Sequence, residues 1–565
     1  MLKTVWGENL DTKCPLSEYP RPQFKRDSYM SLNGEWQLKF SECEEIPEFY
    51  TYNITVPFSP ESELSGVMRR PKDEEYLIYK KDFELEPDFN QDRVFLHFGA
   101  VDQIAKVYLN DKFVGSHHGG YTPFTFEITD FLNEDINTLI VTVRDLTERN
   151  SYSRGKQKTN RGNIWYTAQS GIWQSVWLES TPKDYIPYVK ITSDLDRSVV
   201  TFKTDDNIRI EKLIYDGDEL IADTTDDTVF IDNVKTWSPE NPFLYKVIFK
   251  YKKDTVESYF GMRKFSIGKD SNGIERLMLN NKPYFHNGLL DQGYYPDGLL
   301  TPPDNKAMEF DVKSAKKLGF NMLRKHIKIE PLLWYHYCDV NGIIVWQDMI
   351  NGGGEYGLEV SAVPFVGINL DDTNYNTFKR TDTKARALYY QELKEMVDTL
   401  YNCPCIALWT AFNEGWGQFD SDYAYMLIKS WDSTRIVDST SGWHMQNDTD
   451  IISKHIYFTP IVVKKGNLPW CLTEFGGLSL RVPDHTFNYK MFGYKIFKTP
   501  QSLEKAYVKL FERSIISQIK SGLSACVYTQ LTDVEDELNG IFTYDRKVQK
   551  ISTPVLNSIN ERLHL

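Results

Sequence analysis

The stretch Ile406-Ala407-Leu408-Trp409-Thr410-Ala411-Phe412-Asn413-Glu414 is a nearly continuous apolar run that ends in a carboxylate. A strand that is apolar on both faces is typical of a parallel sheet covered by helices. A second run, Trp470-Cys471-Leu472-Thr473-Glu474-Phe475-Gly476-Gly477, also carries a glutamate near its end. We therefore expect both runs to be strands of one buried parallel sheet.

Eight apolar runs alternate with longer helical patterns from about residue 268 onward. Repeated strand–helix units over roughly 300 residues predict a (β/α)8 barrel. Between the runs, the stretches 311–318, 385–401 and 503–519 have the apolar spacing of amphipathic helices. The eight predicted strands are Tyr284–Leu290, Asn321–His326, Ile343–Met349, Ile406–Asn413, Arg435–Thr440, Ile451–Tyr457, Trp470–Phe475 and Leu523–Gln530.

The residues before this barrel form shorter runs rich in β-branched and aromatic side chains, separated by turn residues. This pattern predicts a two-sheet sandwich over residues 1–182. Fewer strand-like runs follow, and they predict a small immunoglobulin-like sandwich over residues 183–267. Because 565 residues are too many for one hydrophobic core, we expect three domains, with the barrel over residues 268–565.

The net charge of −14 argues against a nucleic-acid partner, which would require a basic surface, and against binding to an anionic membrane surface. No apolar run approaches the length of a membrane span, and Met1–Glu8 does not have the pattern of a signal peptide. We therefore expect a cytoplasmic protein, or a periplasmic or secreted one if a leader has been removed. The aromatic fraction of 14% suits either β-sheet cores or the stacking of sugar rings.

The two glutamates at the strand ends indicate a chemistry. An acid at the carboxyl end of a barrel strand points into the mouth, where barrel enzymes have their sites. Glycoside hydrolysis needs a pair of carboxyl groups, and in a retaining enzyme one protonates the leaving oxygen while the other attacks the anomeric carbon. Glu414 and Glu474 could instead be surface residues at strand ends, so the pattern alone leaves the two interpretations about equal.

The whole sequence resembles glycoside hydrolase family 2, the family of β-galactosidase, β-glucuronidase and β-mannosidase. The resemblance implies a jelly-roll sugar-binding-like domain, an immunoglobulin-like domain and a catalytic (β/α)8 barrel. It is carried by motifs in the family's order: Ser31-Leu32-Asn33-Gly34-Glu35-Trp36, Gly99-Ala100-Val101-Asp102, His118-Gly119-Gly120-Tyr121-Thr122-Pro123-Phe124, Ser170-Gly171-Ile172-Trp173-Gln174-Ser175-Val176-Trp177-Leu178-Glu179, Phe260-Gly261-Met262-Arg263, Asn413-Glu414, Thr473-Glu474-Phe475-Gly476-Gly477 and Tyr544-Asp545-Arg546.

The resemblance also implies roles for individual residues. Glu414 would be the general acid/base and Glu474 the nucleophile, while Asn413 would bind the 2-hydroxyl of the sugar. His326 resembles a sugar-contacting histidine of the family, and Tyr457 resembles the residue that orients the nucleophile. His455, two residues earlier on the same strand, is a further candidate for substrate binding.

Some segments depart from the family's patterns. The segment Val345–Gly354 lacks the Glu and His that help large β-galactosidases bind magnesium, so we expect no metal and no cofactor, and we take Asp348 as a ligand of a sugar hydroxyl. Asp291 stands where relatives carry a His-Glu pair, and it is a second such candidate. The Asn-x-Lys motif of β-glucuronidases is missing at Asn539–Tyr544, which disfavours a glucuronidase. Tyr528 and Gln530, at the end of the eighth strand, are expected to line the pocket.

These observations favour a retaining exo-acting glycosidase with a carbohydrate as its substrate. By resemblance the default substrate is a β-galactoside, and a β-mannoside or an α-L-arabinofuranoside stays open. Two other hypotheses are a catalytically inactive carbohydrate-binding protein and a transglycosylase, in which an acceptor sugar replaces water. The resemblance also implies self-association, since members of the family often form dimers or tetramers.

Overall fold

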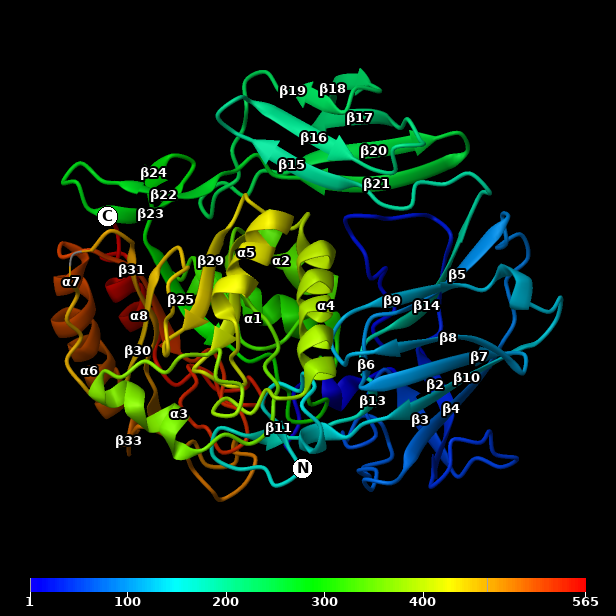
Figure 1. Cartoon of the computed structure of the whole chain (residues 1–565), viewed down its shortest axis with the longest axis horizontal. Coiled ribbons are helices and arrows are strands. Elements are labelled where there is room, and N and C mark those ends of the chain that lie inside the picture. Colours follow the sequence, from blue (N-terminus) through cyan, green and yellow to red (C-terminus); the bar gives the residue numbers. More distant parts are fainter. Residues whose placement is uncertain (1, 465) are drawn as a thin grey trace.

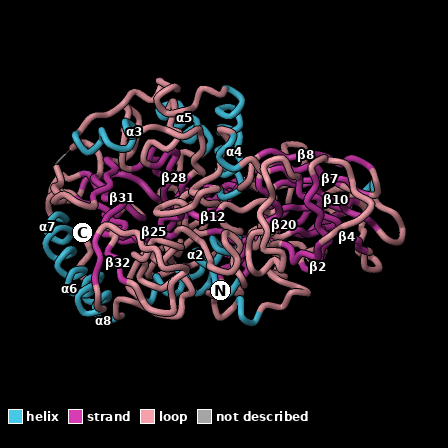
Figure 2. Tube along the Cα trace, turned by 90° about the horizontal axis from the view of Figure 1, so that it is seen from below, coloured by secondary structure: helices cyan, strands magenta, loops and turns pink. Residues whose placement is uncertain are grey.

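The structure is a computed structural model that describes residues 2–464 and 466–565. Its centre is a sheet of eight parallel strands in the order β29-β28-β27-β26-β25-β34-β31-β30. Each of the eight predicted runs overlaps one of these strands to within two residues at either end, and the (β/α)8 barrel is confirmed (Figures 1 and 2). The strands are β25 (His286–Asp291), β26 (Met322–Lys325), β27 (Ile344–Asp348), β28 (Ile406–Asn413), β29 (Ile436–Ser441), β30 (Ile452–Ile456), β31 (Trp470–Gly476) and β34 (Leu523–Thr529).

Side-chain hydrogen bonds connect β29 and β30, the two end strands of this order. The hydroxyl of Ser453 lies 3.2 Å from the hydroxyl of Ser441 and accepts from the amide of Gly442, also at 3.2 Å. The Ser441 hydroxyl is also 3.1 Å from Nε2 of His455. These contacts bring the end of β30 to the end of β28, because the amide of Glu414 donates to the carbonyl of Ser441 at 2.9 Å.

Helices surround the barrel, as the tube view shows (Figure 2). The three amphipathic stretches coincide with helices, the first two running one residue past the helix end, and the last one contains a π-helical segment, η5 (Phe511–Ile516). Aspartate caps begin two of them: Asp304 accepts from the amide of Lys306, and Asp382 from that of Lys384. The main helices are α1 (Asn305–Lys317), α2 (Leu332–Asn341), α4 (Thr383–Leu400), α5 (Ser421–Trp431), α6 (Pro500–Leu510) and α8 (Thr553–Asn560). No helix among the described residues is long and apolar enough to cross a membrane.

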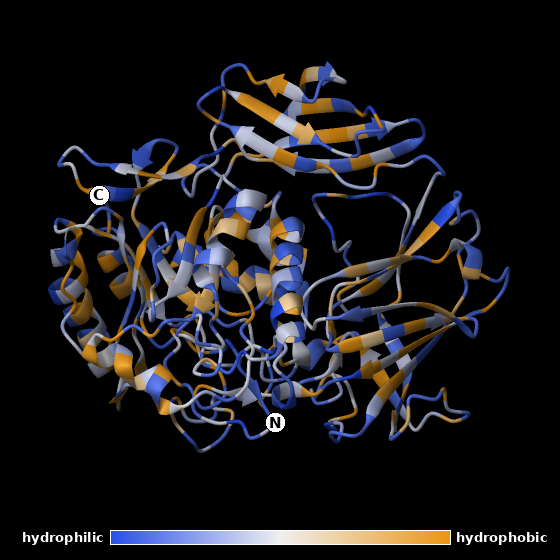
Figure 3. Ribbon diagram, viewed as in Figure 1, coloured by the Kyte–Doolittle hydropathy of each residue, from blue (hydrophilic) through white to orange (hydrophobic). Residues whose placement is uncertain are grey.

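Two β-sandwiches precede the barrel, as predicted, and Figure 1 shows the first in blue beside it and the second above it. The first is a jelly roll whose larger sheet has the order β3-β2-β4-β10-β7-β8 and whose second sheet has the order β1-β14-β5-β9. Apolar and polar residues alternate along such strands (Figure 3). In β2 (Gly34–Ser41), for example, every second side chain is buried. Its other strands are β1 (Tyr29–Ser31), β3 (Tyr52–Val56), β4 (Tyr76–Phe83), β5 (Arg93–Phe98), β7 (Ile104–Leu109), β8 (Lys112–His118), β9 (Phe124–Glu127), β10 (Asn137–Arg144) and β14 (Val176–Thr181).

The second sandwich is immunoglobulin-like, with sheets β15-β16-β19 and β18-β17-β20-β21. A small sheet leads from it to the barrel, made of β22 (Phe265–Lys269), β23 (Glu275–Leu279) and β24 (Lys282–Pro283). The expected boundary between residues 267 and 268 falls inside β22, so we propose a division just before this strand, and we retain the division after residue 182. The strands of the second sandwich are β15 (Lys190–Asp194), β16 (Val199–Lys203), β17 (Glu211–Asp216), β18 (Glu219–Thr224), β19 (Thr228–Phe230), β20 (Tyr245–Tyr251) and β21 (Asp254–Phe260).

One segment of the jelly roll, residues 153–167, crosses to the barrel. It contains the short strands β11 (Gln157–Lys158; Figure 1) and β12 (Tyr166–Thr167; Figure 2), which pair in parallel. The amide of Arg154 donates to the carbonyl of Asn351 at 2.9 Å, and the amide of Thr167 donates to Glu535 at 2.9 Å. We call residues 153–167 the crossing segment. It forms part of the wall of the barrel mouth.

Candidate active site

Glu414 and Glu474 lie together at the carboxyl end of the barrel. Glu414 follows β28 with a left-handed backbone (φ 52°), and Glu474 lies on β31. A carboxylate oxygen of each and a ring nitrogen of His455 all lie within 4.8 Å of one another. Nδ1 of His455 is 2.7 Å from Oε1 of Glu414 and 3.7 Å from Oε2 of Glu474. The fold thus brings the two carboxyl groups to the separation that a retaining pair requires, about 5 Å.

A buried arginine, Arg324 on β26, organises the floor of this site. Its guanidinium donates to both oxygens of Asp348 at 3.0 Å, to Oδ1 of Asn413 at 2.7 Å and to Oε1 of Glu474 at 3.2 Å. It also lies 3.3 Å from Nε2 of His455. Because a guanidinium can only donate, Nε2 accepts there, and Nδ1 carries the proton that faces Glu414.

Sequence reasoning missed Arg324. The signal was present, because an arginine inside an apolar strand of a two-sided parallel sheet can only be buried, and a buried guanidinium needs carboxylate partners.

The surroundings of Glu474 hold it in its ionised form. Burial alone would raise its pKa, but the electrostatic effects of His455, His326 and Arg324 outweigh burial and lower the pKa to about 2. The phenol of Tyr457 donates to Oε2 at 2.7 Å. This ring stacks on Tyr494 at 3.8 Å between centroids, so the hydroxyl is held in place. An ionised carboxylate with its position fixed on both oxygens is what a nucleophile needs.

His326 and Asp348 form a buried pair beside this floor. Nδ1 of His326 is 2.8 Å from Oδ2 of Asp348. Burial lowers the pKa of His326 to about 4, so the ring is neutral near pH 7. Burial would raise the pKa of Asp348, but the charge of Arg324 lowers it below the ordinary value. Because Arg324 and His326 already occupy both oxygens of Asp348, its observed contacts hold Arg324 in position, and Nε2 of His326 is left as an acceptor.

Asn413 presents a free donor. Its Oδ1 accepts from Arg324, which orients the amide, while its buried Nδ2 has no hydrogen-bond partner. Buried donors without a partner are uncommon in proteins, and one that borders a site fits an acceptor on the ligand. The position of Nδ2 therefore fits the predicted contact to a sugar hydroxyl.

The remaining predicted residues lie elsewhere. Asp291 on β25 forms a buried ion pair with Lys325 at 2.7 Å and accepts from the amide of Gly293. Tyr528 on β34 points outward and packs against Tyr507 and Phe511 of the surrounding helices. Gln530 donates to Asn539 at 2.7 Å. We therefore no longer propose Tyr528 as a pocket residue, because its strand position faces the helix layer. Its neighbour Thr529 contacts Tyr457 at 2.9 Å instead.

A cavity of about 490 Å³ opens above Glu414, His455 and Tyr457. Half of its lining residues are aromatic, and such rings suit stacking against the apolar faces of sugars. Sequence reasoning noted the high aromatic content but could not place these rings, because they come from loops far apart in the chain. They are Trp165, Tyr356, Trp416, Trp443, Tyr457, Phe458, Phe492 and Tyr494.

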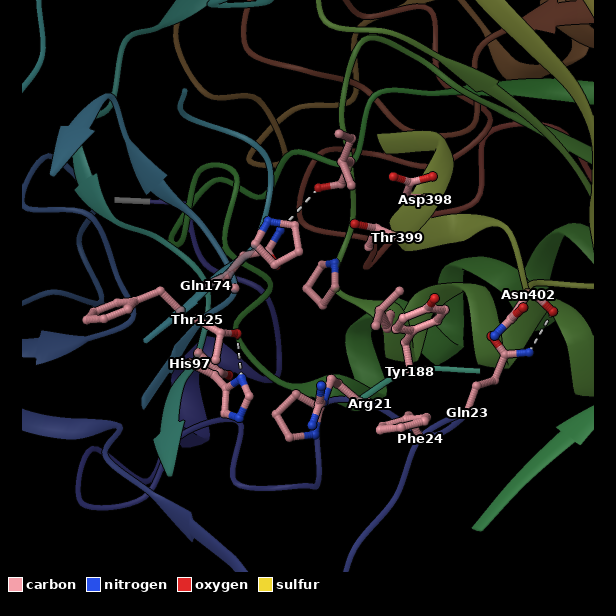
Figure 4. A pocket seen from close by; sticks show the side chains of 18 of the residues that line it. Arg21, Gln23, Phe24, His97, Thr125, Gln174, Tyr188, Asp398, Thr399 and Asn402 are labelled. Atoms are coloured by element: carbon pink, nitrogen blue, oxygen red, sulfur yellow. Dashed lines mark hydrogen bonds between the residues drawn. The ribbon is translucent and has the colours of Figure 1, made fainter. Parts of the chain in front are cut away.

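A second cavity, of about 520 Å³, lies where the jelly roll meets the barrel and the second sandwich (Figure 4). Two carboxylates line it, but both are already engaged: Glu330 with Lys325 at 2.8 Å, and Asp398 with Lys394 on α4. The Gln174 side chain donates to the carbonyl of Ile329 and the Gln23 side chain to that of Asn402, as the dashed lines show. These contacts leave no free acid pair there, so the first cavity is the candidate active site.

Among the described residues, only Glu414, His455 and Glu474 group their side chains closely enough to hold a metal ion. Each of them already has a protein hydrogen-bond partner, and these contacts serve the carboxyl chemistry described above. In the segment where relatives bind magnesium, Asn351 donates to the carbonyl of Asn413 at 3.1 Å. That the protein needs no metal stays a prediction.

Replacing Tyr457 with phenylalanine is expected to lower kcat about 10- to 100-fold, because one charge-assisted hydrogen bond to Glu474 is lost. The stacking on Tyr494 remains, so the unfolding temperature should change little. Steady-state kinetics and thermal unfolding of Tyr457→Phe and the wild type test this. A variant with unchanged kcat would show that Tyr457 does not hold the nucleophile.

The barrel, the two sandwiches before it and the paired carboxylates place this chain in the class of multidomain barrel proteins that act on carbohydrates. Three family models cover most of the chain: "Glycosyl hydrolases family 2, sugar binding domain" at residues 23–182, "Glycosyl hydrolases family 2" at 185–263, and "Glycosyl hydrolases family 2, TIM barrel domain" at 275–467. The chain belongs to glycoside hydrolase family 2.

Similar proteins carry different substrate names. A β-galactosidase of Priestia megaterium is 24% identical over 83% of this chain and 46% of its own length. A β-glucuronidase of Streptococcus agalactiae is 26% identical over 70% of this chain and 68% of its own length. The chain thus spans about half the length of the β-galactosidases it matches.

Solved structures share the fold. A β-D-glucuronidase of Dictyoglomus thermophilum has a TM-score of 0.75 at 18% identity, over 96% of this chain and 98% of that one. A β-galacturonidase of Eisenbergiella tayi has a TM-score of 0.70 at 20% identity, over 96% and 99%. Together these proteins support the architecture, and they leave the sugar to be argued from the site.

Proposed function

We propose that the protein is a retaining exo-glycosidase that removes a terminal sugar from a glycan or glycoside. The observation that carries this proposal is the separation of the two carboxyl groups, whose oxygens lie within 4.8 Å at the carboxyl end of the barrel. Inverting enzymes keep their carboxyl groups about 6.5–9.5 Å apart to admit a water molecule, whereas retaining enzymes keep them at about 5–5.5 Å.

In the proposed mechanism, Glu474 attacks the anomeric carbon while Glu414 protonates the departing oxygen. Arg324 and Tyr457 each hold one oxygen of Glu474, so its attack needs little reorganisation. After the aglycone leaves, Glu414 removes a proton from water; the water oxygen bonds to the anomeric carbon, and the bond between this carbon and Glu474 breaks, which frees the Glu474 carboxylate. His455 donates to Glu414 through Nδ1 and thereby orients that carboxyl group during both steps.

The position of the carboxylates supports action on a chain end. Glu474 is 5% exposed and Glu414 is 9% exposed, so the protein encloses both carboxylates almost completely, as expected for a site that holds the end of a chain. In this proposal the terminal sugar lies next to Glu414, His455 and Tyr457, and the aromatic rings of the same cavity contact the rest of the substrate.

Two classes of sugar are candidate substrates. The β-galactoside expected from the sequence is one of them, supported by the relative from Priestia megaterium. The relatives named for glucuronides and galacturonides support an acidic sugar instead. A panel of nitrophenyl glycosides that also holds a β-mannoside and an α-L-arabinofuranoside separates these candidates. The same panel with added acceptor sugars separates hydrolysis from transglycosylation.

The anomer that is released tests the mechanism. Proton NMR of the first product should show the sugar with the anomeric configuration of the substrate, because two displacements restore it. A product of opposite configuration would exclude Glu474 as the nucleophile. A protein that binds sugars but cleaves none of the panel would be a carbohydrate-binding relative.

Replacing Glu414 with glutamine is expected to affect poor leaving groups far more than good ones. Loss of a general acid costs about 10²- to 10⁴-fold in rate. The kcat/KM for methyl glycosides should therefore fall by this whole factor. The kcat/KM for nitrophenyl glycosides, whose leaving group needs little protonation, should fall much less. Equal losses on both substrates would contradict the acid/base role of Glu414.

A further inference from the structure

The crossing segment places an unusual lysine beside the candidate active site. Lys156 is 7% exposed, and its ammonium lies 5.5 Å from the ring centres of both Tyr166 and Trp416. Trp416 lines the cavity, and its ring centre lies 6.5 Å from that of His326. In the part of the chain that the structure describes, the Lys156 ammonium has neither a hydrogen-bond acceptor nor an ion-pair partner.

The other buried lysines of the described chain all have acceptors. Burying an ammonium costs several kcal/mol unless it is paired, which is why paired lysines are the norm inside proteins. Lys156 is therefore the exception among five buried lysines. The acceptors of the others are the carbonyl of Thr225 for Lys212, Asp291 for Lys325, the carbonyl of Gly293 for Lys328 and Asp533 for Lys550.

The local chain geometry turns Lys156 toward the barrel. In an extended segment, side chains two positions apart share a face and the one between them points the other way. Gln157 points into the jelly roll, where it donates to Asp102 at 3.0 Å. Lys158, on the opposite face, lines the cavity and lies 4.4 Å from the ring of Trp165. Lys156 lies in the turn just before this strand, and its contact with the ring of Trp416 shows that its side chain also faces the barrel.

The charge of Lys156 reaches the catalytic residues. It lowers the pKa of Glu474, although less than His455, His326 and Arg324 do, and it lowers the pKa of His326 after the larger effect of burial. Its charge also acts on Glu537, which accepts from the phenol of Tyr166. Burial raises the pKa of Glu537, with the charge of Lys156 opposing it. The ammonium thus stands at the edge of the sugar site without a direct partner.

We propose that Lys156 binds an anionic substituent of the sugar that is cleaved, so that the preferred substrates are uronides, whose ring carries a carboxylate. This inference rests on the proposed function. A carboxylate supplies both the acceptor and the charge that the buried ammonium lacks, whereas a neutral hydroxyl supplies only an acceptor. Lys156 also offsets the repulsion that a substrate carboxylate would meet from Glu474. The residue that selects the substrate thus belongs to the jelly roll, whereas the residues that cleave it belong to the barrel.

The test compares matched pairs of substrates. The kcat/KM for nitrophenyl β-galacturonide and β-glucuronide is measured beside that for the corresponding β-galactoside and β-glucoside, in the wild type and in Lys156→Gln. We expect the wild type to prefer a uronide. In Lys156→Gln, kcat/KM for that uronide should fall about 10- to 100-fold, mainly through a higher KM, and kcat/KM for the corresponding neutral glycoside should fall only slightly. Lys156→Arg should restore much of the loss, and the exposed Lys112→Gln of the same sandwich is the matched surface control.

Three outcomes would overturn the inference, two in the kinetic comparison and one in a binding measurement. The first is a wild type that prefers neutral sugars, and the second is a Lys156→Gln variant that loses equally on acidic and neutral partners, which would indicate a structural role. If no glycoside is cleaved, the proposed function itself has failed. Calorimetric titration with galacturonate and glucuronate then decides the inference: binding that Lys156→Gln weakens supports it, and no binding, or equal binding, overturns it.

Discussion

Replacing Glu474 with glutamine is expected to lower kcat on the best substrate on the order of 10⁴-fold, the scale seen when a catalytic nucleophile or its partner is removed. The amide has almost the shape of the carboxylate but cannot form the glycosyl bond. Arg324 and Tyr457 would keep donors directed at the new side chain, so the fold should persist. Steady-state kinetics with a nitrophenyl glycoside, beside circular dichroism, measure both effects.

A buried glutamate outside the site serves as the control. Burial raises the pKa of Glu392 on α4 to about 8, so this side chain is largely protonated near neutral pH and donates or accepts much as an amide does. Its Oε2 accepts from the hydroxyl of Ser153 at 2.6 Å in the crossing segment. Glu392→Gln should therefore retain activity. If Glu474→Gln retains more than a small fraction of the wild-type rate, another group is the nucleophile.

The second large effect is expected at Arg324. Arg324→Leu leaves Asp348 and Glu474 buried without their shared cation, and breaking a buried pair costs about 3–5 kcal/mol in the free energy of unfolding. Arg324→Lys keeps a charge but loses the fork that contacts Asp348, Asn413 and Glu474 together, so it should fold better and still lose about 10²-fold or more in kcat/KM. Urea unfolding and kinetics of both variants separate the two losses.

The pH dependence gives Arg324 a readout that a purely structural role would not move. The pKa of Glu474 lies at about 2, below its ordinary value of 4.5, so Glu474 is ionised through the working range and protonates only as the pH falls toward 2. Removing a neighbouring positive charge raises that pKa. The acid limb of kcat/KM in Arg324→Leu should therefore move to higher pH, and Arg324→Lys, which keeps the charge, should move it less. An unmoved limb would show that Arg324 does not stabilise the ionised nucleophile.

Sequence reasoning predicted the parts of this site that depend on strand ends. Glu414 and Glu474 close apolar runs, and the carboxyl ends of barrel strands converge, so their proximity followed from the fold. Asn413, His326, His455 and Tyr457 lie around the same carboxylates for the same reason. The pattern could not show which partners each side chain would have. Asp348, expected at a sugar hydroxyl, is held by Arg324, and Asp291 is held by Lys325.

Two kinds of residue escaped prediction for physical reasons. Tyr528 and Thr529 are neighbours on a strand buried on both faces, and only one of them can face the barrel interior. In such a strand both faces are apolar, so the sequence has no alternation of apolar and polar residues that marks the inner face. It therefore could not show that Thr529, and not Tyr528, faces the interior. Lys156 and Trp165 come from the jelly roll, and no spacing in the sequence reveals that a segment more than 200 residues before Glu414 borders it.

The crossing segment also bears on how such proteins diversify. The groups proposed to break the bond and the groups proposed to choose the sugar lie in different parts of the chain, which meet only at the mouth of the barrel. An exchange of the N-terminal sandwich between relatives would replace the wall of the cavity and leave both carboxylates in place. Proteins that share one barrel could in this way keep the same catalytic chemistry and act on different sugars.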